Sequence, residues 1–185
     1  MHQIVRFNYG KEGLLARGQA IASPPGLRSL PANKGIEALV FVPKGLPLAG
    51  TLIAISERGL DKAGNIGAFL IGGPTPGAFA IKRSGSYDDA ALLPDGNILL
   101  LERRFGWAIG LAVRLRRIAL GDLKPGALAD GAVLFEADLG YEIDNMEALS
   151  VHRAAGGEIV LTLVSDDNFS VIQRTLLLQF ALTEP

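Results

Sequence analysis

The chain of 185 residues is 49% hydrophobic and 20% charged, with a formal net charge of −1. This length can bury the core of one globular domain, or of one piece of a larger one, and the balanced charge gives no bias toward nucleic acid. Without cysteine, disulfides and thiolate metal sites are excluded, and with only His2 and His152 a histidine-based zinc site is not expected. The apolar runs are shorter than the roughly 20 residues of a membrane helix. Residues 1–10 lack the apolar core of a leader peptide. The absence of cysteine fits cytosol and periplasm alike, so the compartment stays open.

Short apolar runs that end in Gly, Pro, Asn or Asp follow one another along the chain. Runs of this length are typical of strands and too short for helices. The segment Ser23–Gly35 is expected to be an irregular connection, and no helix is predicted. In chain order, the expected strands are Gln3–Tyr9, Ile36–Val42, Thr51–Ser56, Ile66–Ile71, Ala78–Lys82, Ala90–Leu93, Asn97–Glu102, Leu111–Leu120, Ala132–Glu136, Glu147–His152, Glu158–Ser165 and Arg174–Leu182.

Three segments repeat one pattern, in which an acid followed by Ala opens a strand and a second acid ends the next strand. The pattern is clearest in Gly35–Glu57 and Asn145–Asp167, and it is degenerate in Tyr87–Phe105. Between these segments there is room for two further strands. Four antiparallel strands at a period of roughly 40–50 residues are typical of a β-propeller blade.

The predicted fold is therefore all-β, a single domain over residues 1–185 built from propeller blades of four antiparallel strands. The blades are expected at about residues 35–83, 88–136 and 145–183, with outer strands of a preceding blade at 3–20. This makes about three and a half blades, whereas propellers usually close with four to eight. Exposed blade edges would favour pairing with another copy of the chain or with further blades.

Blade geometry predicts that the acids of the repeat gather at one rim of the ring. The innermost strand of a blade pairs antiparallel with the next one, so the start of the first and the end of the second share one rim. The expected pairs, one per blade, are Glu37 with Glu57, Asp89 with Glu102, and Glu147 with Asp166. Carboxylates this close repel one another unless cations neutralise them, and oxygen ligands without Cys or His favour calcium or magnesium.

Structural roles for the same residues stay open. Asp and Glu at strand ends also form turns or accept backbone hydrogen bonds. The basic residues beside them either hold a phosphate by bidentate hydrogen bonds or pair with neighbouring acids. These basic residues are Arg58, Lys82, Arg83, Arg103, Arg104 and Arg174. Two sharper motifs are not found: the segment around Asp166 lacks the Gly and Glu of an EF-hand loop, and no serine stands in a G-x-S-x-G motif.

Several segments resemble the phytase-like β-propeller family, whose members are described as having esterase-like activity of phytase. They are NKGIEALVFVPKG with LIAISE, LLPDGNILLLERRF with RLRRIAL, DNMEALSV, and LVSDDNFSVIQRTLLLQFAL. The match covers most of residues 33–182, and the closing SDDNF-x-x-x-QRT-x-L segment is specific. The resemblance implies that the chain is the C-terminal part of a larger propeller, often exported to the periplasm or secreted.

The resemblance also implies a site. β-Propeller phytases hold calcium ions with acids at one mouth of the channel, where the metal neutralises phosphate and presents water for attack. Glu147 and Asp166 are the carboxylates expected to act in catalysis, and Arg103 and Arg174 are the expected phosphate contacts. The implied calcium ligands are Glu37, Glu57, Glu102, Glu147, Asp166 and Asp167.

Three functions follow as alternatives. The first is a calcium-dependent phosphoric-ester hydrolase acting on a small-molecule phosphate ester, expected to be inactive as a fragment. The second is a non-catalytic propeller of the cell envelope that binds or scaffolds other molecules. The third is a lactonase or carboxylesterase on the same scaffold. None of the three involves nucleic acid or a membrane span.

Overall fold

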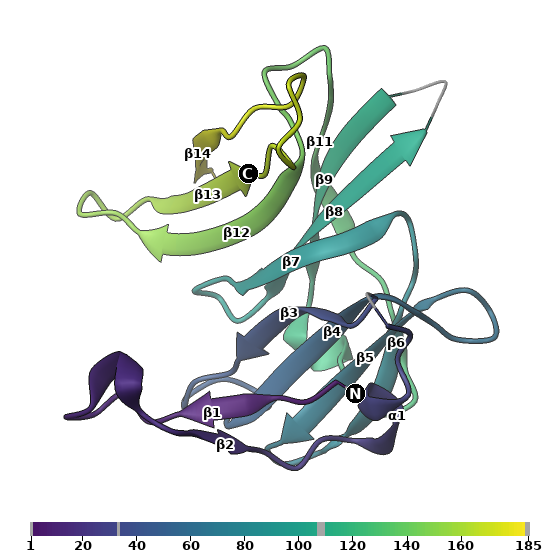
Figure 1. Ribbon diagram of the computed structural model, residues 1–185, viewed down its shortest axis with the longest axis vertical. Coiled ribbons are helices and arrows are strands. Elements are labelled where there is room, and N and C mark those ends of the chain that lie inside the picture. Colours follow the sequence, from purple (N-terminus) through teal and green to yellow (C-terminus); the bar gives the residue numbers. More distant parts are fainter. Residues whose placement is uncertain (1, 33, 107–109, 184–185) are drawn as a thin grey trace.

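The computed structural model describes residues 2–32, 34–106 and 110–183, with the backbone alone for Leu14 and for residues 86–88 (Figure 1). The protein is all-β, as predicted. Its described helices are three single turns, the 3₁₀ turns η1 (Gly13–Leu15) and η2 (Leu120–Asp122) and the α-helical turn α1 (Pro25–Arg28). None of the helices in this part of the chain has the length and apolar content needed to cross a membrane.

The strands form three main sheets and a small hairpin. The hairpin pairs β1 (Val5–Phe7) with β2 (Gly18–Ala20). The first sheet has the order β10-β6-β5-β4-β3, with β3 (Ile36–Phe41), β4 (Thr51–Leu60), β5 (Ile66–Gly72), β6 (Gly77–Ile81) and β10 (Leu128–Ala129). The second has the order β11-β9-β8-β7, with β7 (Ser86–Leu92), β8 (Ile98–Gly106), β9 (Gly110–Ile118) and β11 (Ala132–Asp138). The third has the order β12-β13-β14, with β12 (Met146–Arg153), β13 (Ile159–Ser165) and β14 (Leu177–Leu182).

The three sheets stand one after another in the manner of consecutive propeller blades. Strand β3 of the first sheet packs beside β7 of the second, and β7 packs beside β12 of the third. β3, β7 and β12 each form one edge of their sheet, and the remaining strands of each sheet follow outward from that edge (Figure 1). The described sheets do not close into a ring.

Apolar side chains fill the spaces between neighbouring sheets. Ile53 and Ile55 of β4 pack with Ile98 and Leu100 of β8 between the first and second sheets. Because side chains alternate along a strand, the neighbouring residue Leu99 points the other way and packs with Leu161 between the second and third sheets. The alternation explains why β4 and β8 read as nearly continuous apolar runs in the sequence: both faces of each strand pack in a core.

A third, smaller core covers the far face of the first sheet. Ile4 and Leu27 of the N-terminal segment pack there on Ala54 and Phe69. Leu27 lies in α1, inside the connection that was predicted to be irregular, and Pro25 suits the first position of this turn. One turn of helix has no sequence periodicity to detect, so the sequence could not predict it.

Strand β10 was also not predicted, because a two-residue strand carries no alternation. It pairs parallel to β6, with Leu128 opposite Ala80 and Ala129 opposite Ile81. The chain between β9 and β11 thus returns to the edge of the first sheet before it completes the second. This exchange ties the two sheets together through the backbone.

A β-bulge interrupts the innermost strand of all three sheets at the same place. Glu37 is the extra residue between Ile36, opposite Ser56, and Ala38, opposite Ile55. Glu147 is the extra residue between Met146 and Ala148 in the third sheet. A bulge re-aims the side chain that it inserts, which turns both glutamates away from the sheet pairing.

In the second sheet the residue at this bulge is Asp88, because Tyr87 lies opposite Glu102 and Asp89 opposite Leu101. The predicted alignment of the middle repeat is therefore wrong by one residue. Glu102 corresponds to the serines Ser56 and Ser165, and the counterpart of Glu57 and Asp166 is Arg103. The pattern Asp-Ala misled the alignment because two aspartates precede Ala90.

Glu102 is buried and forms an ion pair with Arg116 of β9. The two side chains are 2% and 3% exposed, and Arg116 Nη2 lies 2.5 Å from Glu102 Oε1. Arg116 also donates to Asp130 Oδ1 at 2.7 Å and to the backbone oxygen of Lys82 at 2.9 Å. Lys82 directly follows β6 of the first sheet and holds the pKa of Asp130 below its usual range by hydrogen bonding. The pair therefore lies at the junction of the first and second sheets.

We predict that Arg116→Met destabilises the protein by about 3–5 kcal/mol, because it leaves Glu102 buried without a counter-charge. The matched control is Arg114→Met, two residues away on β9, whose pair with Glu136 is partly exposed and should contribute less than about 1 kcal/mol. Urea unfolding followed by circular dichroism measures both. Equal losses of stability in the two variants would contradict the assignment.

Candidate functional site

Side chains from all three sheets converge on one small cavity of about 200 Å³. Glu37 and Glu57 come from the first sheet, Arg103 from the second and Glu147 from the third. The bulges on β3 and β12 aim Glu37 and Glu147, while Glu57 and Arg103 occupy the equivalent place on β4 and β8. The structure thus brings together three of the seven predicted acids, with an arginine among them.

Arg103 is fixed in this cavity by two neighbours on the third sheet. Its Nη1 donates to Glu147 Oε1 at 2.7 Å and to Asn145 Oδ1. Asn145 is buried, and its Nδ2 donates to Glu147 Oε1 at 2.6 Å and to the backbone oxygen of Asp166 at 3.2 Å. Asn145 therefore orients both the Arg103 guanidinium and the Glu147 carboxylate. It opens the third repeat, but the sequence did not predict it as a site residue.

The three carboxylates share an excess of negative charge. Partial burial, followed by the charges of Glu57 and Glu147, raises the pKa of Glu37 above its usual value, while Arg103 opposes this rise. One guanidinium therefore does not neutralise the group. A cation or a proton would relieve the repulsion.

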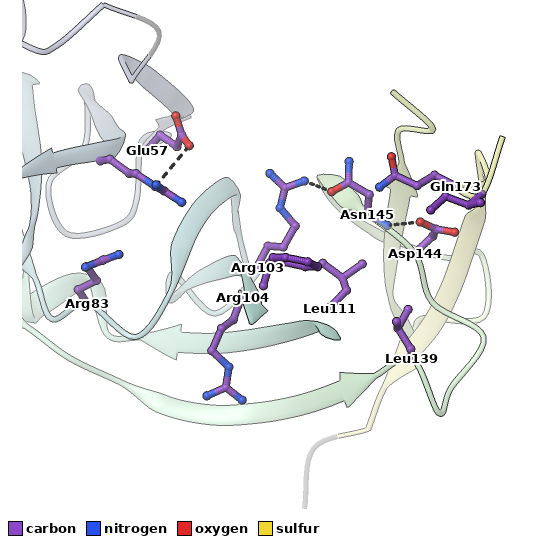
Figure 2. Close-up of a pocket in the computed structure, with 12 residues that line it drawn as sticks. Glu57, Arg83, Arg103, Arg104, Leu111, Leu139, Asp144, Asn145 and Gln173 are labelled. Atoms are coloured by element: carbon purple, nitrogen blue, oxygen red, sulfur yellow. Dashed lines mark hydrogen bonds and ion pairs between the residues drawn. The ribbon is translucent and has the colours of Figure 1, made fainter. Parts of the chain in front are cut away.

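A larger cavity of about 510 Å³ shares Glu57 and Arg103 with the first and extends between the sheets (Figure 2). Its described lining includes four arginines, Arg58, Arg83, Arg103 and Arg104, against two carboxylates, Glu57 and Asp144. Figure 2 shows Glu57 and Arg83 on one side of this space, with Arg103, Asn145 and Leu111 on the other.

The arginines differ in how far acids already engage them. Arg58 Nε lies 3.7 Å from Glu57 Oε1, and Arg104 Nη2 lies 3.5 Å from Glu136 Oε1. Arg83 donates its Nε to the backbone oxygen of Gly85 at 3.2 Å and pairs with none of the described carboxylates. Arg83 is thus the lining arginine that is most available to an anion.

The remaining predicted acids lie elsewhere. Glu102 is in the buried pair with Arg116. Asp89 accepts hydrogen bonds from the backbone N–H groups of Ala90 and Leu149, at 2.7 and 2.8 Å, and so joins β7 to β12; burial raises its pKa. Asp166 and Asp167 accept from the N–H groups two residues further on, those of Asn168 and Phe169, and close their own turn.

Arg174, a predicted phosphate contact, holds the same loop in place. Its Nη1 lies 3.0 Å from Glu142 Oε2, and its backbone N–H donates to Asp144 Oδ2 at 3.0 Å. Hydrogen bonding to Glu142 raises the pKa of the Arg174 guanidinium. Two acids therefore engage Arg174, which lines neither cavity, although its partner Asp144 lines the larger one.

In the described part of the chain, no three His, Cys, Asp or Glu side chains lie close enough together to hold a metal ion as they stand. Glu37, Glu57 and Glu147 line one cavity but have Arg103 among them. The donor set is purely oxygen, which is the chemistry that calcium and magnesium prefer.

The chain is thus an all-β protein of blade-like sheets, with three glutamates and an arginine gathered where the innermost strands begin. The sequence model of the phytase-like family, described as esterase-like activity of phytase, matches residues 2–169. The chain belongs to this family. Searches of curated proteins and of solved structures find no match.

We predict that Glu37→Gln stabilises the protein more at pH 7 than at pH 4. The pKa of Glu37 is raised on folding, so its carboxylate costs stability as the pH rises above the unfolded value of 4.5, and glutamine removes this cost. Urea unfolding at the two pH values measures the difference. In a Glu57→Gln background the gain should shrink, since one repelling charge is gone; an unchanged gain would contradict the coupling.

Proposed function

We propose that the protein is a calcium-dependent phosphoric-ester hydrolase of the phytase-like kind. The observation that supports this best is the convergence of Glu37, Glu57, Glu147 and Arg103 from three sheets on one cavity that opens beside further arginines. Acids suited to a hard cation and arginines suited to a phosphate thus lie side by side. Membership of the phytase-like family agrees with this chemistry.

Glu37, Glu57 and Glu147 are the residues that would hold calcium. Their donors are all oxygen, and burial together with the charges of Glu57 and Glu147 raises the pKa of Glu37, while Arg103 opposes this rise. Calcium, when bound, would neutralise phosphate charge and lower the pKa of a coordinated water. Glu147 must then exchange part of its contact with Arg103 for the metal, which frees that guanidinium to face a substrate.

Arg103 and Arg83 would hold the phosphate group. A guanidinium donates two parallel hydrogen bonds to phosphate oxygens, and Asn145 keeps Arg103 oriented toward the cavity. Positioning and charge neutralisation of this kind account for most of the catalysis of phosphoryl transfer. Arg174 is not assigned this role, because Glu142 and Asp144 engage it.

The two carboxylates expected to act in catalysis differ in their surroundings. Glu147 lines the cavity and is held by Arg103 and Asn145, whereas Asp166 is occupied with its own turn. We therefore assign Glu147 to calcium binding and give Asp166 no catalytic role.

We predict that isothermal titration calorimetry detects calcium binding, and that Glu37→Gln and Glu147→Gln each weaken it by roughly ten-fold or more, because each removes a charged ligand. The control is Glu136→Gln, a glutamate that pairs with Arg104 and Arg114 instead of lining the acidic cavity. No calcium uptake, or equal loss in the control variant, would contradict the site.

We further predict calcium-dependent hydrolysis of 4-nitrophenyl phosphate by the protein with its ring of blades complete. Arg103→Ala should lower kcat/KM by roughly 10²-fold, in the range found when one stabilising donor is removed from an enzyme site. Arg153→Ala is the control, since Arg153 lines neither cavity and its Nη1 donates to the backbone oxygen of Gly157. Hydrolysis of carboxyl esters alone would indicate an esterase. Variants that change only the melting temperature, in a protein without hydrolase activity, would indicate a binding or scaffold propeller.

A further inference from the structure

We infer that the larger cavity selects phosphate monoesters whose alcohol part is apolar, an aryl or alkyl group, over polar or multiply phosphorylated ones. The inference rests on the proposed function, because it takes the arginines as the phosphate site. It adds a second wall of the cavity, which the acids and arginines do not explain.

This wall is made of large apolar side chains from four segments. Phe105 is the last residue but one of β8 and Leu111 is the second residue of β9, while Leu139 follows β11 and Ile172 lies in the loop between β13 and β14. Phe105, Leu139 and Ile172 are 66%, 59% and 86% exposed, although large apolar side chains usually avoid water. Three such groups around one cavity are a binding surface that an apolar ligand group would cover.

The loop that carries Ile172 is held in shape by its own polar residues. Ser170 Oγ accepts from the Ile172 N–H at 3.4 Å, and Thr175 Oγ1 donates to Asp167 Oδ2 at 3.1 Å. At the end of the loop, the Arg174 N–H donates to buried Asp144 at 3.0 Å. A loop fixed in this way presents Ile172 to the cavity without the entropy cost of ordering a mobile segment.

The charges of the cavity limit how many phosphates it can take. Glu57 and Asp144 lie in its lining, and Glu57 already engages Arg58. One phosphate can settle against Arg83 and Arg103, but further phosphates would meet these carboxylates or the apolar wall. Burying unpaired charge against apolar side chains is costly. A volume of about 510 Å³ suits one phosphate with one ring or short alkyl chain.

The test compares the binding of phenylphosphonate and methylphosphonate, which are not hydrolysed. The two ligands carry the same phosphonate group and differ only in the apolar substituent. In isothermal titration calorimetry with calcium present, phenylphosphonate should bind roughly ten-fold more tightly, the gain expected for burying one aromatic ring in part. Inorganic phosphate serves as the reference for the arginine site alone.

Ile172→Ser and Leu139→Ser should each remove a large part of this preference while leaving the affinity for inorganic phosphate unchanged. The matched control is Val171→Ser: Val171 is fully exposed in the same loop but does not line the cavity. Circular dichroism melts of the three variants confirm that each is folded.

Equal binding of the two phosphonates, or loss of the preference in Val171→Ser as in Ile172→Ser, would overturn the substrate assignment. If inorganic phosphate still binds, the proposed hydrolase function is not contradicted by this result. If inorganic phosphate and both phosphonates fail to bind, the proposed function falls together with the inference. A preference that Ile172→Ser and Leu139→Ser reduce, and Val171→Ser does not, supports both.

Discussion

The buried ion pair between Glu102 and Arg116 fixes the strand from which the site is built. It anchors the middle of β8 to β9, and through Lys82 and Asp130 it joins the second sheet to the first. Arg103 follows Glu102 directly, and side chains alternate along a strand, so a carboxylate held inward directs the next side chain to the cavity. A buried pair of this kind adds little net stability but strongly disfavours alternatives that break it.

In the other two sheets, a serine takes the place of Glu102 and also links its strand to a neighbouring segment. Ser56 Oγ donates to the Gly67 oxygen at 2.7 Å, and Ser165 Oγ to the Arg174 oxygen at 2.6 Å, each across to the following strand or loop. A hydroxyl suffices where the neighbouring backbone is near, whereas Glu102 reaches an arginine. The residue after each anchor, Glu57, Arg103 or Asp166, then stands at the rim.

The cavity therefore combines one fixed framework with unlike charges. Bulges on β3 and β12 turn Glu37 and Glu147 toward it, while the anchors on β4 and β8 present Glu57 and Arg103. The exchange of an acid for an arginine in the middle sheet places Arg103 among the three glutamates and beside the further arginines of the larger cavity. The apolar side chains of the neighbouring cavity stand next to the arginine group.

The sequence alone determined the all-β class, most strands and the acids worth examining, because alternation, turn residues and a repeated motif are local properties of the chain. It did not determine the bulges, since Asp88 and Asp89 are equivalent on paper and only strand pairing shows which one is extra. Nor did the sequence show that Glu102 is buried whereas Glu57 lines a cavity, because the burial of Glu102 depends on its ion pair with Arg116 on the neighbouring strand. Tertiary structure alone decided that Asn145, Arg83 and Ile172, from distant parts of the chain, line a common cavity, because that depends on how the sheets pack.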